Sequence, residues 1–141
     1  MFDVVVVGAD DSATAHRAVE AATGIALMSG GSLHIVSAYG PTSYADSAVP
    51  DEFKHVNSEG DVDALLQVLS FIAKKRGIDP VLHAVKGSVA DVLLNKAEQL
   101  GADLIVVGNR GMKGVRRVLG SVPNSVAHGA HCSVAIIDTT E

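Results

Sequence analysis

The stretch VVVVGADDS, residues 4–12, decides the fold. Four β-branched residues in a row that end at a glycine, Gly8, are typical of a strand buried on both faces, as in a parallel sheet covered by helices. Residues 15–26 then place apolar side chains at helical spacing, and Ser12 is suited to cap that helix. The opening of the chain therefore predicts a strand that leads into a helix, the first half of a βαβ unit.

The alternation of strand and helix patterns continues to the end of the chain. Further strands are predicted at residues 32–39, 81–85, 103–108 and 133–138, and further helices at about 60–76, 87–102 and 120–129, with Ser88 and Gly101 as caps of the middle one. Residues 40–59 show no period and predict a long surface loop. Helices between successive strands imply right-handed crossovers. We expect an α/β fold, one doubly wound five-stranded parallel sheet in the order 3-2-1-4-5 with helices on both faces, as a single domain of residues 1–141.

Composition restricts the classes of function. The net charge is −5 at pH 7, Trp is absent, and there are only two Tyr and three Phe. These values argue against nucleic-acid binding, which needs a basic face and uses aromatic rings to stack bases. No apolar run is long enough to span a membrane, no secretory signal pattern precedes the first strand, and the single Cys132 fits a reducing compartment. We expect a cytoplasmic protein with no nucleic-acid or membrane partner.

A second stretch, VVGNRGMKGVRRVLGSV at residues 106–122, combines glycines with basic side chains. Open parallel sheets bind ligands beyond the carboxyl ends of their strands, where the strand order reverses. In the expected order this point lies between the ends of the first strand, residues 8–10, and of the fourth strand, residues 108–111. The basic stretch is therefore predicted to lie where a ligand binds.

The residue types of this stretch indicate an anion site. Gly108 and Gly111 allow the backbone to approach a ligand closely, although glycines at strand ends also serve packing. Gly120 and Ser121 begin the next helix, whose N-terminus attracts anions. Arg110 and the basic residues that follow it add positive charge. Together these features predict a phosphate cradle.

The familiar nucleotide fingerprints do not fit the chain. A Walker A motif needs a lysine between its last glycine and the serine or threonine, and here Gly120 and Ser121 are adjacent. The G-x-G-x-x-G pattern is absent after the first strand, because GADDSA contains one glycine. The segment SGGS at residues 29–32 lies between a helix and a strand and is more simply a helix-ending turn. A nucleotide would have to be held in another way.

Gly108-x2-Gly111 followed by Gly120-Ser121 closely resembles the G-x2-G-x9-G-[S/T] ATP-binding signature of the universal stress protein family. The likeness covers the whole chain, since VVVVGADDS resembles the family's opening strand ending in G-x-D-x-S, and GSVADVLLNKAEQLGADLIVVG and the closing short strand also match. One feature departs from the family pattern. Eight residues, 112–119, separate the second and third glycines where the signature has nine.

The resemblance implies an adenine nucleotide alpha hydrolase-like fold and an ATP-type ligand. It implies that the glycines and Ser121 surround the phosphates, that Asp10 lies by the ribose, and that backbone near Ala38 and Val107 lies by the adenine. The full set of residues expected at the ligand is Gly8, Ala9, Asp10, Ala38, Val107, Gly108, Arg110, Gly111, Gly120, Ser121 and Val122. It also implies a homodimer through the apolar strand at residues 133–138. The need for Mg²⁺, and AMP or cyclic AMP as the ligand, stay open.

Neither a catalytic nor a metal site is indicated. Ser121 has no histidine nearby in the sequence to activate it, so at most weak ATP hydrolysis is expected. A cluster of His128, His131 and Cys132 lacks the four ligands of structural zinc and predicts a surface turn. His34 and His83 lie in apolar strands and are expected to be hydrogen-bonded within the core.

Two functions stay open at this point. The first is an ATP-binding regulatory protein of the stress response, a homodimer that the nucleotide switches without strong catalysis. The second keeps the fold without the nucleotide, as a dimeric interaction or scaffold module, and the short spacer favours it. A cyclic AMP binder is a variant of the first function. A true ATPase or nucleotidyl-transfer enzyme needs a catalytic group that the sequence does not reveal.

Overall fold

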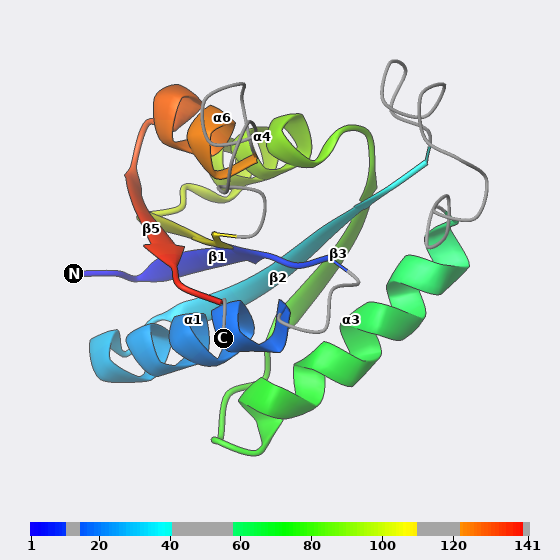
Figure 1. The fold of residues 1–141 in the computed structure, drawn as a ribbon. Helices are drawn as coiled ribbons and strands as arrows, with labels where there is room; N and C mark the ends of the chain where they lie inside the picture. The colour runs from blue at the N-terminus through cyan, green and yellow to red at the C-terminus, as the bar shows by residue number, and fades with distance from the viewer. Residues whose placement is uncertain (11–14, 41–57, 110–121, 140–141) are drawn as a thin grey trace.

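The computed structural model describes residues 1–10, 15–40, 58–109 and 122–139. In these residues five parallel strands form one sheet in the order β3-β2-β1-β4-β5, which confirms the predicted order (Figure 1). The strands are β1 (Val4–Gly8), β2 (Ser32–Tyr39), β3 (Val81–Lys86), β4 (Leu104–Gly108) and β5 (Ser133–Ile137). The helices are α1 (Ala15–Ser29), α3 (Glu59–Lys74), α4 (Val89–Leu100) and α6 (Val122–Gly129).

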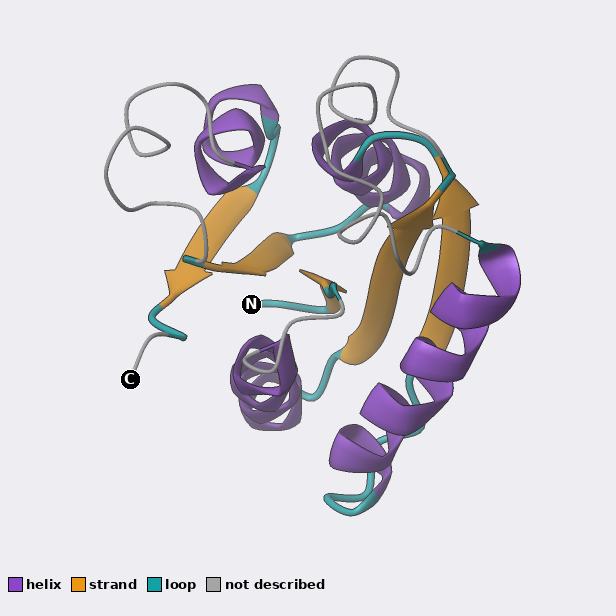
Figure 2. Cartoon of the chain, turned by 45° about the vertical axis from the view of Figure 1, so that its right-hand side comes forward, coloured by secondary structure: helices purple, strands orange, loops and turns teal. Residues whose placement is uncertain are grey.

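Helices cover both faces of the sheet, as the sequence pattern predicts (Figures 1 and 2). On one face α1 packs on β1, and α3 packs beside it on β2 and β3, in the same cluster as Val5 and Val7. On the other face α4 and α6 belong to the same cluster as Val6. All three of these valines are 0% exposed. Burial of a valine side chain contributes on the order of 1.5–3 kcal/mol, so a strand with apolar residues on both faces is stable only between two helix layers.

The ends of most elements agree with the sequence. Strand β4 begins at Leu104 and not at 103. Asp103, just before it, donates its backbone N–H to the Val4 carbonyl at 2.9 Å, and its carboxylate accepts the backbone N–H groups of Asp3 and Val4 at 3.0 and 2.9 Å. Strand β5 ends at Ile137 and not at 138. Beyond Ile137, the side chain of Asn109, the residue after β4, bonds to residues 138 and 139, as described below. Of the loop expected at 40–59, residues 41–57 lie outside the described residues, and the end of the prediction was wrong, because Ser58 caps α3 and Glu59 is its first residue.

The two helix caps predicted for α4 stand at the expected positions, but one of them does not make the expected hydrogen bond. Gly101 ends α4 in the left-handed conformation with φ 65°, as predicted. Ser88 does stand at the N-cap of α4, but its hydroxyl donates to the Asp91 carboxylate at 2.9 Å and makes no bond to the helix backbone. Helix α3 begins at Glu59 because Ser58 caps it, with its hydroxyl accepting the N–H of Asp61 at 3.1 Å. The predicted cap Ser12 lies outside the described residues.

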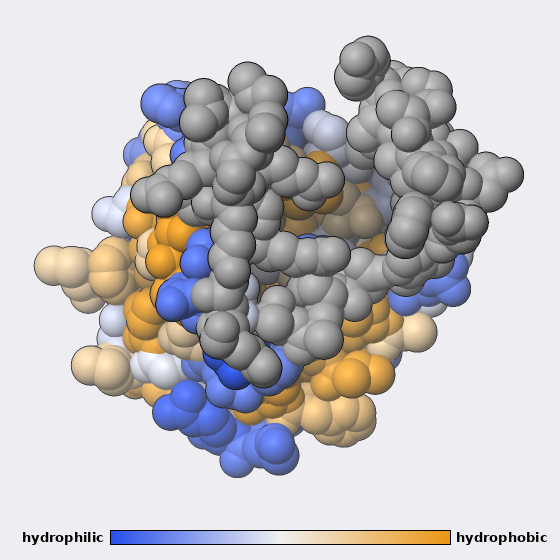
Figure 3. Space-filling view, in the orientation of Figure 1, coloured by the Kyte–Doolittle hydropathy of each residue, from blue (hydrophilic) through white to orange (hydrophobic). Residues whose placement is uncertain are grey.

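Apolar side chains on the surface are distributed over several elements. In the view of Figure 3 hydrophilic residues gather at the lower edge, and apolar residues lie beside them. Met28 on α1 is 90% exposed, and Val68 and Phe71 on α3 are 66% and 60% exposed. The described part of the chain includes no helix with both the length and the apolar composition to cross a bilayer.

Candidate functional site

The carboxyl ends of β1 and β4 lie side by side at the centre of the sheet. Val5, Val6 and Val7 pair in parallel with Leu104, Ile105 and Val106. The helix after β1, α1, covers one face of the sheet, and the helix after β4, α6, covers the other. The strand order therefore reverses between these two ends, the place where open sheets bind ligands. We call residues 8–10 and 108–109 the switch point.

On the β1 side of the switch point, the backbone of Ala9 is bound to β2. Its N–H donates to the carbonyl oxygen of Val36 at 2.9 Å, and its carbonyl accepts the buried hydroxyl of Ser37 at 2.8 Å. Asp10 follows with an exposed side chain. Of the predicted ligand residues on this strand, Asp10 thus has a side chain that solvent reaches, whereas Ala9 is 7% exposed and shapes the strand end.

The two strand-end glycines leave no room for a side chain. A Cβ atom added to Gly8 would lie 2.7 Å from Cδ1 of Leu93, and one added to Gly108 would lie 2.9 Å from Cγ2 of Thr139. Real Cβ atoms do not approach neighbours this closely. Both glycines, predicted for ligand contact, therefore also have a packing role in the protein itself.

On the β4 side, the Asn109 side chain binds the segment that follows β5. Its Oδ1 accepts the N–H of Thr139 at 3.0 Å and the Thr139 hydroxyl at 3.2 Å, and its Nδ2 donates to Oδ1 of Asp138 at 3.2 Å. The backbone N–H of Asn109 donates to the Ile137 carbonyl at 2.9 Å. We call the three side-chain bonds the Asn109 bridge. Sequence reasoning missed it, because the partners lie about 30 residues away and leave no local pattern.

The remaining predicted ligand residues fall into two groups. Ala38, Val107 and Val122 belong to one apolar cluster under α4 and α6, and Val107 is only 3% exposed, so its side chain is not available to a ligand. Val122 is also the first residue of α6, whose first turn carries no acidic side chain. Arg110, Gly111, Gly120 and Ser121 lie outside the described residues.

A second contact that sequence reasoning missed ties the end of β2 to α3. The Tyr39 hydroxyl lies close to the carboxylate of Glu59, the first residue of α3. Partial burial, followed by the nearby carboxylates of Glu59 and Asp63, raises the pKa of Tyr39 above its ordinary value. The Tyr39 carbonyl also accepts the N–H of Gly87 at 3.0 Å. This end of β2 is thereby fixed to its neighbours on two sides.

His34 on β2 and His83 on β3 form a half-buried pair, which confirms the expectation of hydrogen-bonded histidines. Nδ1 of His34 lies 2.9 Å from Nε2 of His83, and the ring centres are 5.2 Å apart with planes at 24°. Burial, and secondarily the Lys96 ammonium, lowers the pKa of both rings. These two ring nitrogens are hydrogen-bonded to each other. No group of three or more metal-binding side chains occurs among the described residues.

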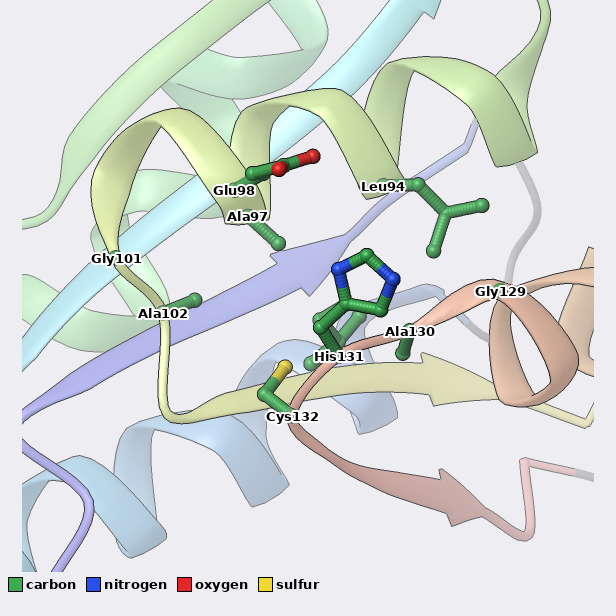
Figure 4. A pocket seen from close by; sticks show the side chains of 10 residues that line it. Leu94, Ala97, Glu98, Gly101, Ala102, Gly129, Ala130, His131 and Cys132 are labelled. Carbon is green, nitrogen blue, oxygen red and sulfur yellow. The ribbon is translucent and has the colours of Figure 1, made fainter.

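A shallow cavity of about 320 Å³ lies at the opposite end of the sheet (Figure 4). Leu94, Ala97 and Glu98 of α4 line it together with residues 129–132, which connect α6 to β5. His131 is exposed, as predicted for a surface turn, while Cys132 is half-buried and burial raises its thiol pKa. A thiol in this state is a poor nucleophile. The cavity lies at the amino ends of the strands, away from the switch point.

The family model described as the universal stress protein family matches residues 1–138. The chain belongs to this family. The resemblance seen in the sequence is thereby confirmed over almost the whole length of the chain.

Individual members of the universal stress protein family are similar over their full length. Universal stress protein Rv1636 of Mycobacterium tuberculosis is 35% identical, over 99% of this chain and 98% of that protein. A universal stress protein solved in complex with cAMP is 34% identical, with a TM-score of 0.81, over 99% of this chain and 98% of that one. The universal stress protein of Archaeoglobus fulgidus in complex with dAMP is 22% identical, with a TM-score of 0.72 over 98% of both chains, and shows the fold.

Proposed function

We propose that this universal stress protein binds an adenine nucleotide at the switch point and acts as a regulatory protein of the stress response. The observation that carries the proposal is the relative solved with cAMP, which shares 34% of its residues and the fold over 99% of this chain. The site residues of the proposal are those that the family signature implies. The structure supports it with adjacent strand ends at the point where the strand order reverses.

ATP is the nucleotide that the glycine spacing indicates, and cyclic AMP is the second candidate. The signature glycines and Ser121 argue for a ligand with a chain of phosphates. The spacer of eight residues in place of nine, together with the relative solved with cAMP, favours the smaller phosphate group of a cyclic nucleotide. The proposal leaves AMP and a requirement for Mg²⁺ to the same experiment.

The protein is proposed to act by switching and not by strong catalysis. Two described hydroxyls lie near the switch point, and each is hydrogen-bonded to a carbonyl oxygen that cannot serve as a base: Ser37 to Ala9 and Thr139 to the amide of Asn109. Neither forms the nucleophile–base pair that covalent catalysis requires. At most weak ATP hydrolysis is expected.

A homodimer through β5 completes the proposal. This strand pairs with β4 on one side and lies at the edge of the sheet, with Ile136 40% exposed. An apolar edge strand is a template for pairing with a second chain. The working unit is then a cytoplasmic dimer of 141-residue domains in which each nucleotide lies at the ends of β1 and β4, and β4 pairs directly with the dimer strand β5.

The test combines mass spectrometry of ligand released from purified protein with calorimetric titration of ATP and cyclic AMP. We expect micromolar binding of one nucleotide, lost in Gly111→Asp, whose carboxylate blocks close approach and repels phosphate. Gly24→Asp is the matched control, because Gly24 lies in the second half of α1, does not have a positive φ, and an added Cβ there meets only the Arg76 guanidinium at 3.5 Å. If the unaltered protein binds neither nucleotide, the scaffold function replaces this one.

A further inference from the structure

We propose that Asn109 is a positioning residue, through which the nucleotide affinity of the switch point depends on the segment that follows the edge strand β5. The inference rests on the proposed function, since it concerns the regulation of the same site. Its basis is the Asn109 bridge to Asp138 and Thr139.

The bonding of the Asn109 amide leaves it little capacity for a ligand. A side-chain carbonyl oxygen has two lone pairs, and Oδ1 of Asn109 already accepts two hydrogen bonds, both from Thr139. One N–H of Nδ2 is donated to Asp138. The side chain is therefore largely committed to the protein, and we infer that its effect on a nucleotide acts through the position of its neighbours.

Thr139 is anchored against β4 by more than hydrogen bonds. It is 2% exposed although it follows the last strand, and its Cγ2 occupies the space that a side chain on residue 108 would fill. The absence of a side chain at Gly108 thus admits the Thr139 methyl group. The backbone, hydroxyl and methyl group of Thr139 therefore all lie against Gly108 and Asn109.

The Asn109 bridge continues the hydrogen bonding between β4 and β5 beyond the point where their backbone pairing ends. The last ladder contact between the two strands is the bond from the Asn109 N–H to the Ile137 carbonyl at 2.9 Å. Beyond it, the Asn109 side chain supplies the partners that another strand residue would supply. Through the bridge, the ends of β4 and β5 move as one body. A displacement of the edge strand therefore reaches Asn109 directly, one peptide bond from Arg110.

Two substitutions at Asn109 separate positioning from direct contact. N109A removes the bridge and is expected to weaken binding of the titrated nucleotide, ATP or cyclic AMP, by about tenfold, within the range found for coupled sites. N109D keeps an acceptor for Thr139 but places a carboxylate against the carboxylate of Asp138, and it is expected to weaken binding by a similar factor.

Reversing the polarity of the bridge provides the decisive control. In N109D/D138N the new amide at 138 donates to the carboxylate at 109, so the bond returns with donor and acceptor exchanged and with the wild-type net charge. We expect its nucleotide affinity to return to within about twofold of wild type. If Asn109 contacts the nucleotide itself, the double variant stays as weak as N109D, which overturns the inference.

A measurement without nucleotide keeps this inference distinct from the proposed function. Hydrogen exchange of the Thr139 amide, recorded on the ligand-free protein, is expected to be about tenfold faster in N109A and to return to the wild-type rate in N109D/D138N. If the wild-type protein binds the nucleotide and N109A binds it equally well, the positioning role of Asn109 is overturned and the proposed function stands. Wild type that binds neither nucleotide overturns the proposed function and this inference with it, even if Thr139 is protected.

Discussion

Gly108 has two competing explanations, close approach of a ligand or packing against Thr139, and one substitution distinguishes them. Gly108→Ala adds a Cβ atom 2.9 Å from Cγ2 of Thr139 and 3.4 Å from its Oγ1. Thr139 is buried, so it must shift from its place to admit the added atom. The backbone at Gly108 does not have the positive φ that favours glycine, which makes the contact and not the conformation the source of the effect.

The size of the effect follows from what Thr139 loses. Two hydrogen bonds to Asn109 disappear, at about 1 kcal/mol each. Exposure of the methyl group costs about 0.8 kcal/mol more. Alanine in place of glycine returns about 0.5–1 kcal/mol through the lower entropy of the unfolded chain. We therefore expect Gly108→Ala to lower the free energy of unfolding by about 2 kcal/mol.

Thr139→Ser is the partner in a double-mutant cycle, because it deletes Cγ2 and keeps the hydroxyl. Alone it is expected to cost about 1 kcal/mol for the lost methyl group. In the double variant the added Cβ occupies the vacated space, so the two effects do not add and a coupling of about 2 kcal/mol is expected. Urea unfolding measures the free energy of unfolding of all four proteins, and the dependence of that free energy on urea concentration is expected to be the same in each. Additive effects, within about 0.5 kcal/mol, would refute the packing explanation.

Other predictions concern the caps and the histidine pair. Burial lowers the pKa of His34 and His83 in the folded protein below 6.5, so the unfolded chain takes up protons first, and stability falls as the pH drops below about 6.5. Urea unfolding from pH 7.5 to 5 should show this slope, and a His34→Gln/His83→Gln variant should flatten it; an equal slope in the variant contradicts the assignment. Ser58→Ala removes the cap of α3 and should lower the free energy of unfolding by about 1 kcal/mol in urea, whereas Ser88→Ala, whose hydroxyl makes no cap bond, should cost less. Asp103→Asn loses charge-assisted bonds to two backbone N–H groups and should lower the melting temperature by several degrees, about the effect of 1–2 kcal/mol, and an unchanged melting curve would contradict it.

The strands and their order could be predicted because the signals are local. The valine run of β1 and the helical spacing after it indicate which faces of the strand and of the helix are buried. The alternation of strands and helices leaves few possible topologies. The switch point follows from that topology without knowledge of any side-chain contact. The family signature then named residues at the same point, so two independent arguments agreed on its location.

The contacts that give the switch point its detail could not be predicted. Asn109 and Thr139, and likewise Tyr39 and Glu59, come close together only in the folded sheet. Each pair is too far apart in the sequence for a local pattern to predict the contact. At Ser88 the sequence indicated a cap, and the choice of the hydroxyl between backbone and Asp91 is a matter of rotamer. Likewise a glycine looks the same in the sequence whether a ligand or a methyl group fills the space beside it.

Strand β1 alternates its valines between the two apolar clusters, and this has a consequence for cooperativity. Val5 and Val7 are shared with the α1 and α3 layer and Val6 with the α4 and α6 layer, so neither layer can open without exposing one side of the same strand. A subglobal opening that spares β1 is possible only at the sheet edges. A ligand held at residues 8–10 is therefore attached to a strand that both layers share, and its binding energy would protect both layers at once.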